Sequence, residues 1–208
     1  MFYKIIRPLM YAFYKVFYRV KVFGKENLIK KGKCIVICNH LGKADVLPVG
    51  ALYKDKTIFL SKKEWYDNKV LGWVMIKLGS IPIDRDKPSI ATIKQALQVL
   101  KENKRLGIFP EGRRNFETND LQEIKEGTSL FAVKGQALIT PVIIYDRLQM
   151  FKKNYLIVGK PIDLSSYYDK KFDGEVSKEC TKIITDTMVN IQQELFKIVE
   201  DLKTKKAK

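Results

Sequence analysis

The sequence has few of the residues that build metal centres and disulfide frameworks. It contains three cysteines, Cys34, Cys38 and Cys180, and a single histidine, His40, among 208 residues. The cysteine count is odd and includes no C-x-x-C pair, which indicates a reducing compartment with unpaired, buried thiols. A structural zinc site would require all three thiols and the lone histidine, so the sequence indicates no metal and no organic cofactor.

Long apolar runs and acidic residues are also scarce. No run reaches the roughly 18 apolar residues of a membrane-spanning helix, and Lys4 and Arg7 are followed by further basic residues with no signal-cleavage site. We therefore expect a protein that is cytosolic or lies on a membrane surface. The 23 acidic residues against 39 basic ones leave a net charge of +16, which attracts nucleic acid, anionic lipid or phosphorylated substrates.

The overall composition is that of a single folded domain. Hydrophobic residues make up 46% of the chain and charged residues 30%, which excludes a disordered protein. The sequence shows no internal repeat and no linker, and a chain of this length is commonly a single domain. We divide it into an N-terminal amphipathic segment at residues 1–23, a main domain at residues 24–202 and a frayed basic tail at residues 203–208.

The N-terminal segment places apolar residues at helical spacing with basic residues between them, and it has no acidic residue before Glu26. Pro8 is expected to kink this helix or to divide it into a pair. One interpretation is an amphipathic helix packed on the core. The density of Phe and Tyr beside uncompensated Lys and Arg favours a second one, a helix that lies in the lipid interface of an anionic membrane.

After Gly24 the pattern alternates between short apolar strands and helices. Strands are predicted at residues 33–38, 57–61, 79–84, 105–110, 137–144 and 155–162. Helices are predicted at residues 65–78, 88–103 and 176–203. Because the strands are almost continuously apolar, they are expected to be buried on both faces, which predicts an α/β sheet covered by helices.

The first polar cluster follows the strand at residues 33–38 and contains Asn39, His40 and Asp45. A neutral histidine accepts a proton near physiological pH, and a carboxylate on its other ring nitrogen fixes the tautomer and stabilises the imidazolium. A general base at His40 is therefore one interpretation. The alternative is structural, because Asp45 also stands where it would cap a helix that begins at Val46.

Three further clusters follow later strands. Arg85, in the stretch Gly79 to Asp86, offers a fork of donors for a phosphate, although the stretch also suits a solvated turn. Phe109 to Asn115 gathers Glu111, Arg113 and Arg114, with surplus positive charge for an anion, and a surface ion-pair turn is the alternative. Pro141 is expected at a sheet edge or a bulge.

The order of these clusters resembles the glycerolipid acyltransferase family that includes the 1-acylglycerol-3-phosphate acyltransferases. The matching motifs are Asn-His-x4-Asp at 39–45, Gly-x-Ile-x-Ile-Asp-Arg at 79–85, Phe-Pro-Glu-Gly-x-Arg at 109–114 and Thr-Pro-Val at 140–142. Residues 59–73 are also similar to the family's Lys-Lys-Glu segment, and the likeness covers about residues 20 to 165. Two stretches depart from the family: HLGKAD lacks a Gln-Ser pair after the histidine, and EGRRN replaces the usual Thr and Ser.

The resemblance implies a mixed, mostly parallel sheet flanked by helices. It also implies that His40 is the general base and Asp45 its partner. Substrate-binding roles fall on Lys62, Arg85 and Arg114 for the acceptor's phosphate, on Glu111 for the glycerol and on Gly112 for close approach. Backbone amides near Gly42 or Gly112 are candidate donors to the oxyanion, and the buried thiols are expected to be inert.

The expected function is phospholipid biosynthesis: transfer of an acyl chain from acyl carrier protein or coenzyme A to the sn-2 hydroxyl of lysophosphatidate, which makes phosphatidic acid. The expected location is the cytoplasmic face of the cell membrane, as a peripheral or monotopic protein. Alternatives are the same chemistry on glycerol 3-phosphate or another lysophospholipid, and a basic membrane- or nucleic-acid-binding protein without catalysis. A nucleic-acid partner is not expected, because the basic residues are spread along the chain and no zinc-finger, RNP-like or helix-turn-helix signature is present.

Overall fold

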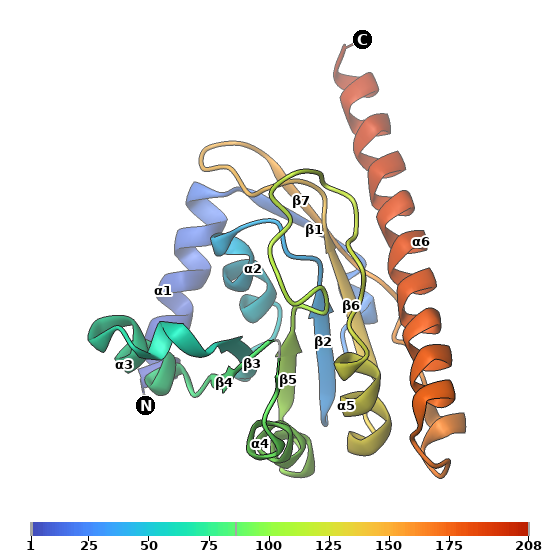
Figure 1. Ribbon diagram of the computed structural model, residues 1–208. Coiled ribbons are helices and arrows are strands. Elements are labelled where there is room, and N and C mark those ends of the chain that lie inside the picture. The colour runs from blue at the N-terminus through green and yellow to red at the C-terminus, as the bar shows by residue number, and fades with distance from the viewer. Residues whose placement is uncertain (1, 86, 208) are drawn as a thin grey trace.

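The protein is described by a computed structural model that covers residues 2–85 and 87–207. Its centre is a seven-stranded sheet in the order β1-β7-β6-β2-β5-β3-β4 (Figure 1). The strands are β1 (Val20–Phe23), β2 (Cys34–Cys38), β3 (Thr57–Lys62), β4 (Ile81–Ile83), β5 (Arg105–Ile108), β6 (Ile139–Ile144) and β7 (Asn154–Val158). All neighbouring strands are parallel except β6 and β7, which confirms the predicted mixed, mostly parallel α/β sheet.

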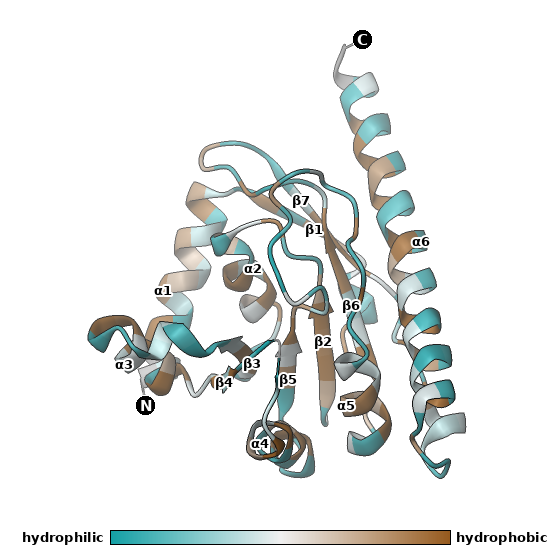
Figure 2. Ribbon diagram, in the orientation of Figure 1, coloured by the Kyte–Doolittle hydropathy of each residue, from teal (hydrophilic) through white to brown (hydrophobic). Residues whose placement is uncertain are grey.

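Helices cover both faces of the sheet. They are α1 (Phe2–Phe17), α2 (Val46–Ala51), α3 (Lys69–Leu78), α4 (Ile90–Lys101), α5 (Gly127–Gly135) and α6 (Gly174–Ala207). Alternate residues of β2 serve opposite layers: Ile35 and Ile37 pack with α4, α5 and α6, whereas Val36 packs with α2. Figure 1 shows α1 and α2 on one side of the sheet and α6 on the other, and Figure 2 shows the apolar strands between them.

The N-terminal helix is shorter than its apolar pattern suggested. It ends at Phe17, Arg19 turns the chain with a φ of 43°, and residues 20–23 form β1, which pairs in parallel with β7. Four residues of the segment predicted as amphipathic helix are therefore an edge strand of the sheet. Pro8 lies inside α1 without dividing it, so the segment contains one helix rather than a pair.

All six predicted strands are present, but α5 was missed and α6 is longer than predicted. The long last helix continues through most of the basic tail to Ala207, while Lys208 lies outside the described residues. Among the described residues, no helix is both long enough and apolar enough to cross a bilayer.

The prediction for Pro141 was wrong. It lies in β6, between β2 and β7, rather than at a sheet edge. The antiparallel register with β7 stops at Val142, and Pro141 comes just beyond it, where its carbonyl accepts a hydrogen bond from the Gly159 amide at 3.0 Å. A missing N–H is tolerated at this position because the ladder with β7 has already ended.

The sheet order explains where the polar clusters meet. β2, β5, β3 and β4 are parallel neighbours, so their carboxyl ends lie along one edge of the sheet. His40 follows β2, Glu111 follows β5, Lys62 ends β3 and Arg85 follows β4. In open α/β sheets this edge is the usual place for a ligand, and here it collects three of the sequence motifs.

Candidate active site

His40 and Asp45 form a buried pair at the end of β2. The imidazole Nδ1 lies 3.0 Å from Asp45 Oδ2, with His40 only 4% exposed and Asp45 fully buried. The same carboxylate oxygen accepts hydrogen bonds from the amides of Leu41 and Gly42, each at 2.7 Å. A carboxylate with three such partners is held firmly in one orientation, and it fixes the imidazole with Nε2 left for a substrate.

The alternative role of Asp45 as a helix cap is not supported. Asp45 does occupy the residue before α2, but its side chain makes no capping hydrogen bond to that helix. All three contacts of Oδ2 point back to the loop that carries His40. Asp45, five residues after His40, therefore orients the imidazole and does not cap α2.

Two neighbours fix the position of the histidine. Asn39 bonds both backbone groups of Ile144 in β6, with its amide nitrogen 3.0 Å from the carbonyl oxygen and its oxygen accepting from the amide at 2.8 Å. The ring of Phe109 stacks on the imidazole with 4.1 Å between centroids. The end of β2 is thus held by β6 on one side and by the loop after β5 on the other.

Glu111 joins the histidine loop to the loop after β5. Its Oε1 accepts a hydrogen bond from the His40 amide at 2.9 Å, and the side chain is 2% exposed. Burial raises the pKa of Glu111 to about 7, opposed by hydrogen bonds from the His40 and Gln122 amides. Oε2 is buried and has no hydrogen-bond partner in the structure, so this carboxyl group retains an unused acceptor beside the base.

Two cavities adjoin at Arg85. One, of about 490 Å³, is mainly apolar; His40 and Phe109 line it together with residues of α1, α2, α3 and β3. The other, of about 470 Å³, is called the polar cavity here because all of its lining residues except Gly112 have charged or polar side chains. Its lining residues are Lys62, Glu64, Asp84, Arg85, Glu111, Gly112, Arg113, Gln122, Glu123 and Lys125. Arg85 lines both cavities, so the arrangement offers an apolar compartment and a charged compartment on either side of one guanidinium.

The structure brings the predicted site residues to these two cavities, except for Asp45, which is buried and reaches the site only through its contact with His40. Lys62, Glu111 and Gly112 line the polar one, while Arg114 lines the apolar one beside His40. Burial, together with the charge of Arg114, lowers the pKa of Arg85. Two cationic groups that disfavour each other at close range provide a site where an anion is favourable.

Some of these groups already have partners. Lys62 Nζ lies 2.9 Å from Glu64 Oε1 on a half-exposed surface, where an ion pair is worth little and exchanges readily. Gly112 has a φ of 71°, a conformation that favours glycine and turns the loop after β5.

Residues 122–125 were missed as part of the site. Gln122 and Lys125 line the polar cavity, and Lys125 Nζ lies 3.5 Å from the carbonyl oxygen of Arg85. They belong to an irregular loop that folds back after the third motif. Nothing in their local sequence pattern predicts that contact, because it depends on how the loop returns to the sheet.

The amides considered as oxyanion donors are occupied. Gly42 N–H donates to Asp45, and Gly112 N–H donates to the Phe109 carbonyl at 3.0 Å. The two glycine amides themselves are therefore not available for the oxyanion in this conformation, and a donor near one of them stays a prediction. A donor from elsewhere, or a shift of the loop, is required.

The thiols do not take part in this arrangement. Cys34, Cys38 and Cys180 are all free and buried, as predicted. Burial raises the pKa of each thiol, and for Cys38 the neighbouring carboxylates of Asp45 and Glu111 raise it further. Within residues 2–85 and 87–207, no group of three or more Cys, His, Asp or Glu side chains has the geometry of a metal site.

Comparison with known proteins gives the family. The family model described as Acyltransferase matches residues 19–145. The 1-acyl-sn-glycerol-3-phosphate acyltransferase of Bacillus subtilis is 32% identical over 71% of this chain and 76% of its own length. The protein of the same name from Borreliella burgdorferi is 30% identical over 82% of this chain and 70% of its own length.

A solved structure supports the fold. The crystal structure of PlsC, the 1-acyl-sn-glycerophosphate acyltransferase of Thermotoga maritima, superposes with a TM-score of 0.65 at 20% identity. The match covers 84% of this chain and 71% of that one. The family match, which covers most of the sheet and all three motifs at its carboxyl edge, and the relatives at 30% identity or more establish that the chain is an enzyme of the Acyltransferase family.

Proposed function

We propose that this enzyme transfers an acyl group from a thioester of coenzyme A or acyl carrier protein to the sn-2 hydroxyl of 1-acylglycerol 3-phosphate. The observation that carries the proposal is that His40, paired with Asp45, lines the apolar cavity, which adjoins the polar cavity at Arg85. The relatives in Bacillus subtilis and Borreliella burgdorferi are named for this acceptor. No cofactor is required for the step.

The chemistry follows from the free nitrogen of the imidazole. His40 Nε2 takes the proton of the acceptor hydroxyl as its oxygen attacks the thioester carbonyl carbon, and Asp45 stabilises the imidazolium. The tetrahedral oxyanion then collapses, the C–S bond breaks, and the proton passes from His40 to the departing thiolate. No covalent acyl-enzyme is formed, which is consistent with the burial and raised pKa of Cys34 and Cys38.

The two cavities divide the substrates. Acyl chains occupy the apolar cavity next to His40, because burying methylene groups there is favourable. The phosphate of the acceptor lies between Arg85, Arg114 and Lys62, since guanidinium groups bind phosphate through two hydrogen bonds at once. Glu111 lines the polar cavity and positions the glycerol there, and Gly112 lets the ligand approach the backbone closely.

The enzyme is proposed to act as a peripheral or monotopic protein at the cytoplasmic face of the membrane. One side of α1 packs on the protein, where Tyr14 is buried. The other side exposes the apolar side chains of Leu9, Phe13 and Val16, which are free to contact lipid. Arg7 ties the helix to the rest of the enzyme through a hydrogen bond from Nε to the Tyr53 carbonyl at 3.0 Å. An anchored helix with an exposed apolar side suits the lipid interface, where the acceptor resides.

The first test is thiol release from an acyl thioester with lysophosphatidate in anionic vesicles. His40→Ala should abolish acceptor-dependent release. Arg85→Ala should raise KM for lysophosphatidate at least about tenfold, since a charge-assisted hydrogen bond is worth about 1.5–3 kcal/mol. Lys160→Ala, an exposed lysine outside both cavities, removes the same charge and should change neither parameter.

The acceptor is identified in the same assay. Glycerol 3-phosphate and lysophosphatidylcholine are offered alone and in competition with lysophosphatidate. Preference for either one would assign the enzyme to another acceptor within the family, and release without any acceptor, unchanged in His40→Ala, would refute the proposed base. A protein that binds vesicles and releases no thiol with any of the three would be a non-catalytic membrane protein.

A further inference from the structure

α3 is an apolar helix that the protein covers on one side only. Eight of its ten residues are glycine or apolar, and Gly72 alone is fully buried. On the inner side, Leu71, Met75 and Leu78 line the apolar cavity. On the outer side, Val70, Trp73 and Ile76 are 75%, 53% and 67% exposed. A helix that is apolar all round is typical of buried or lipid-contacting positions, and this one lies at the surface of the molecule.

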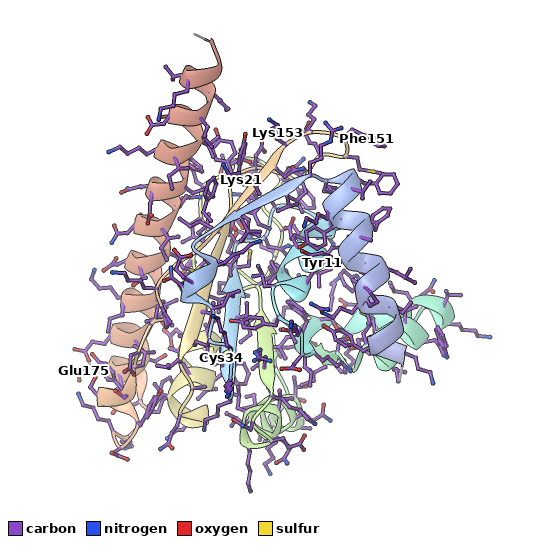
Figure 3. The ribbon with its side chains drawn as sticks, turned by 180° about the vertical axis from the view of Figure 1, so that it is seen from behind. Tyr11, Lys21, Cys34, Phe151, Lys153 and Glu175 are labelled. Atoms are coloured by element: carbon purple, nitrogen blue, oxygen red, sulfur yellow. The ribbon has the colours of Figure 1, made fainter. Side chains whose placement is uncertain are left out.

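The exposed side of α3 belongs to a larger apolar strip. α1 packs beside α3 and exposes Leu9, Phe13 and Val16. At the far end of α1, the loop between β6 and β7 adds Met150 and Phe151, and the ring of Phe151 meets that of Phe17 at 5.7 Å between centroids. Figure 1 shows α3, α1 and this loop along one side of the molecule, and in Figure 3 Phe151 lies at the end of α1 opposite α3.

The charged residues within the segments that form this strip are all basic. Residues 2–17, 69–78 and 147–153 together contain eight basic residues and no acidic one. Within α3, Lys77 Nζ lies 5.8 Å from the centre of the Trp73 ring, so the exposed tryptophan is next to a cation. Tryptophan beside lysine is the composition found at membrane interfaces, and an excess of basic residues within the strip is complementary to an anionic surface.

We propose that α3 is a second membrane-binding element, which inserts Val70, Trp73 and Ile76 into an anionic leaflet alongside α1. The apolar cavity then lies behind the lipid-facing side of α1 and α3, two of the helices that line it. This inference extends the membrane association proposed for α1, on which it rests. It does not depend on which acceptor the enzyme uses.

The test uses the fluorescence of Trp73. The chain has two tryptophans, so Trp65→Phe leaves Trp73 as the only reporter. With vesicles of anionic phosphatidylglycerol, the emission should shift to shorter wavelength, and lipids brominated on the acyl chain should quench it. Vesicles of phosphatidylcholine should produce a much smaller change. Circular dichroism of the variant confirms that its fold is retained.

A second measurement reports on affinity. Val70→Ser with Ile76→Ser should weaken partitioning onto anionic vesicles by about tenfold or more, because two exposed apolar side chains lose their burial in lipid. Ile90→Ser is the matched control, since Ile90 is 72% exposed but lies in α4, outside the strip. Its partitioning should be unchanged.

The outcomes separate this inference from the proposed function. Vesicles that sediment the protein without altering Trp73 emission would overturn it, as would equal partitioning of the double variant and the control. A blue shift that depends on protein concentration without lipid, with a dimer in sedimentation velocity, would assign the strip to a second copy instead. Thiol release from a short-chain, soluble lysophosphatidate without vesicles tests the proposed function on its own.

Discussion

Asp45→Asn tests the role of the buried carboxylate most directly, because it removes the charge and keeps the shape. Asp45 Oδ2 accepts from His40 Nδ1 and from the amides of Leu41 and Gly42. In the variant, an amide oxygen at the Oδ2 position can keep all three hydrogen bonds, but it carries no negative charge to stabilise the imidazolium. The NH₂ group then lies at the buried Oδ1 position, which has no hydrogen-bond partner. The variant therefore isolates the loss of the carboxylate charge as His40 takes up the proton.

The magnitude follows from the geometry. A carboxylate and an imidazolium with charge centres about 4 Å apart attract by about 4 kcal/mol at an effective dielectric constant of 20. Losing that stabilisation as the imidazolium forms corresponds to a fall in kcat of about 10³-fold, at about 1.4 kcal/mol per factor of ten. KM should change little, because Asp45 is fully buried and does not line either cavity.

The assay is steady-state thiol release with saturating acyl thioester and lysophosphatidate, beside a thermal melt of each variant. Asp55→Asn is the control, since it also removes one carboxylate, but its side chain is 79% exposed and pairs with Arg105 at the amino end of β5. A folded Asp45→Asn enzyme that retains kcat within about threefold of wild type would refute the reasoning, and His40 would then act without its carboxylate partner.

Three further predictions concern other sites. Because burial raises the pKa of Glu111 to about 7, the folded state holds a proton that the unfolded chain releases above about pH 4.5. As pH rises from about 4.5 to 7, the free energy of unfolding of wild type should therefore fall by up to about 3 kcal/mol relative to that of Glu111→Gln. Urea titrations measure this difference. The exposed Glu123→Gln is the control, and its free energy of unfolding should follow that of wild type across the same pH range. Cys38→Ala should retain at least about half of the thiol-release rate, since burial keeps the wild-type thiol protonated; loss of all turnover would point to an acyl-cysteine. Gly24→Ala should destabilise the protein by more than about 2 kcal/mol, because φ is 66° and the new Cβ would lie 2.1 Å from a carbonyl oxygen of β7. Gly127→Ala meets no atom within 4 Å, and a similar loss there would contradict that explanation.

Local spacing was sufficient to predict the pair at the centre of the site. His40 and Asp45 stand five residues apart at the end of an apolar strand, and both their contact and the strand were found as expected. The choice between a base partner and a helix cap needed the structure, because both roles use the same aspartate at the same position. Only the direction of Oδ2 distinguishes them.

Other features depend on tertiary contacts that no local pattern encodes. Residues 20–23 continue the apolar and basic alternation of α1, and they become a strand because β7 offers them a free edge. The helix at α3 was predicted from its apolar residues, but the sequence pattern does not tell which of them face solvent. In the structure its outer residues are exposed.

The order of the strands determines which motifs cooperate. Along the chain, Lys62 and Arg85 separate His40 from Glu111, but β5 inserts between β2 and β3 in the sheet. Ile37 of β2 therefore pairs with Ile108 of β5, and the two loops that follow are close enough for the Glu111 carboxylate to bond the His40 amide. β3 and β4 come next, so the basic side chains lie farther from the imidazole than Glu111 does in strand order. Arg85 nevertheless lines the same apolar cavity as His40, so the proposed acceptor can place its phosphate at Arg85 and its hydroxyl at His40 within one continuous space.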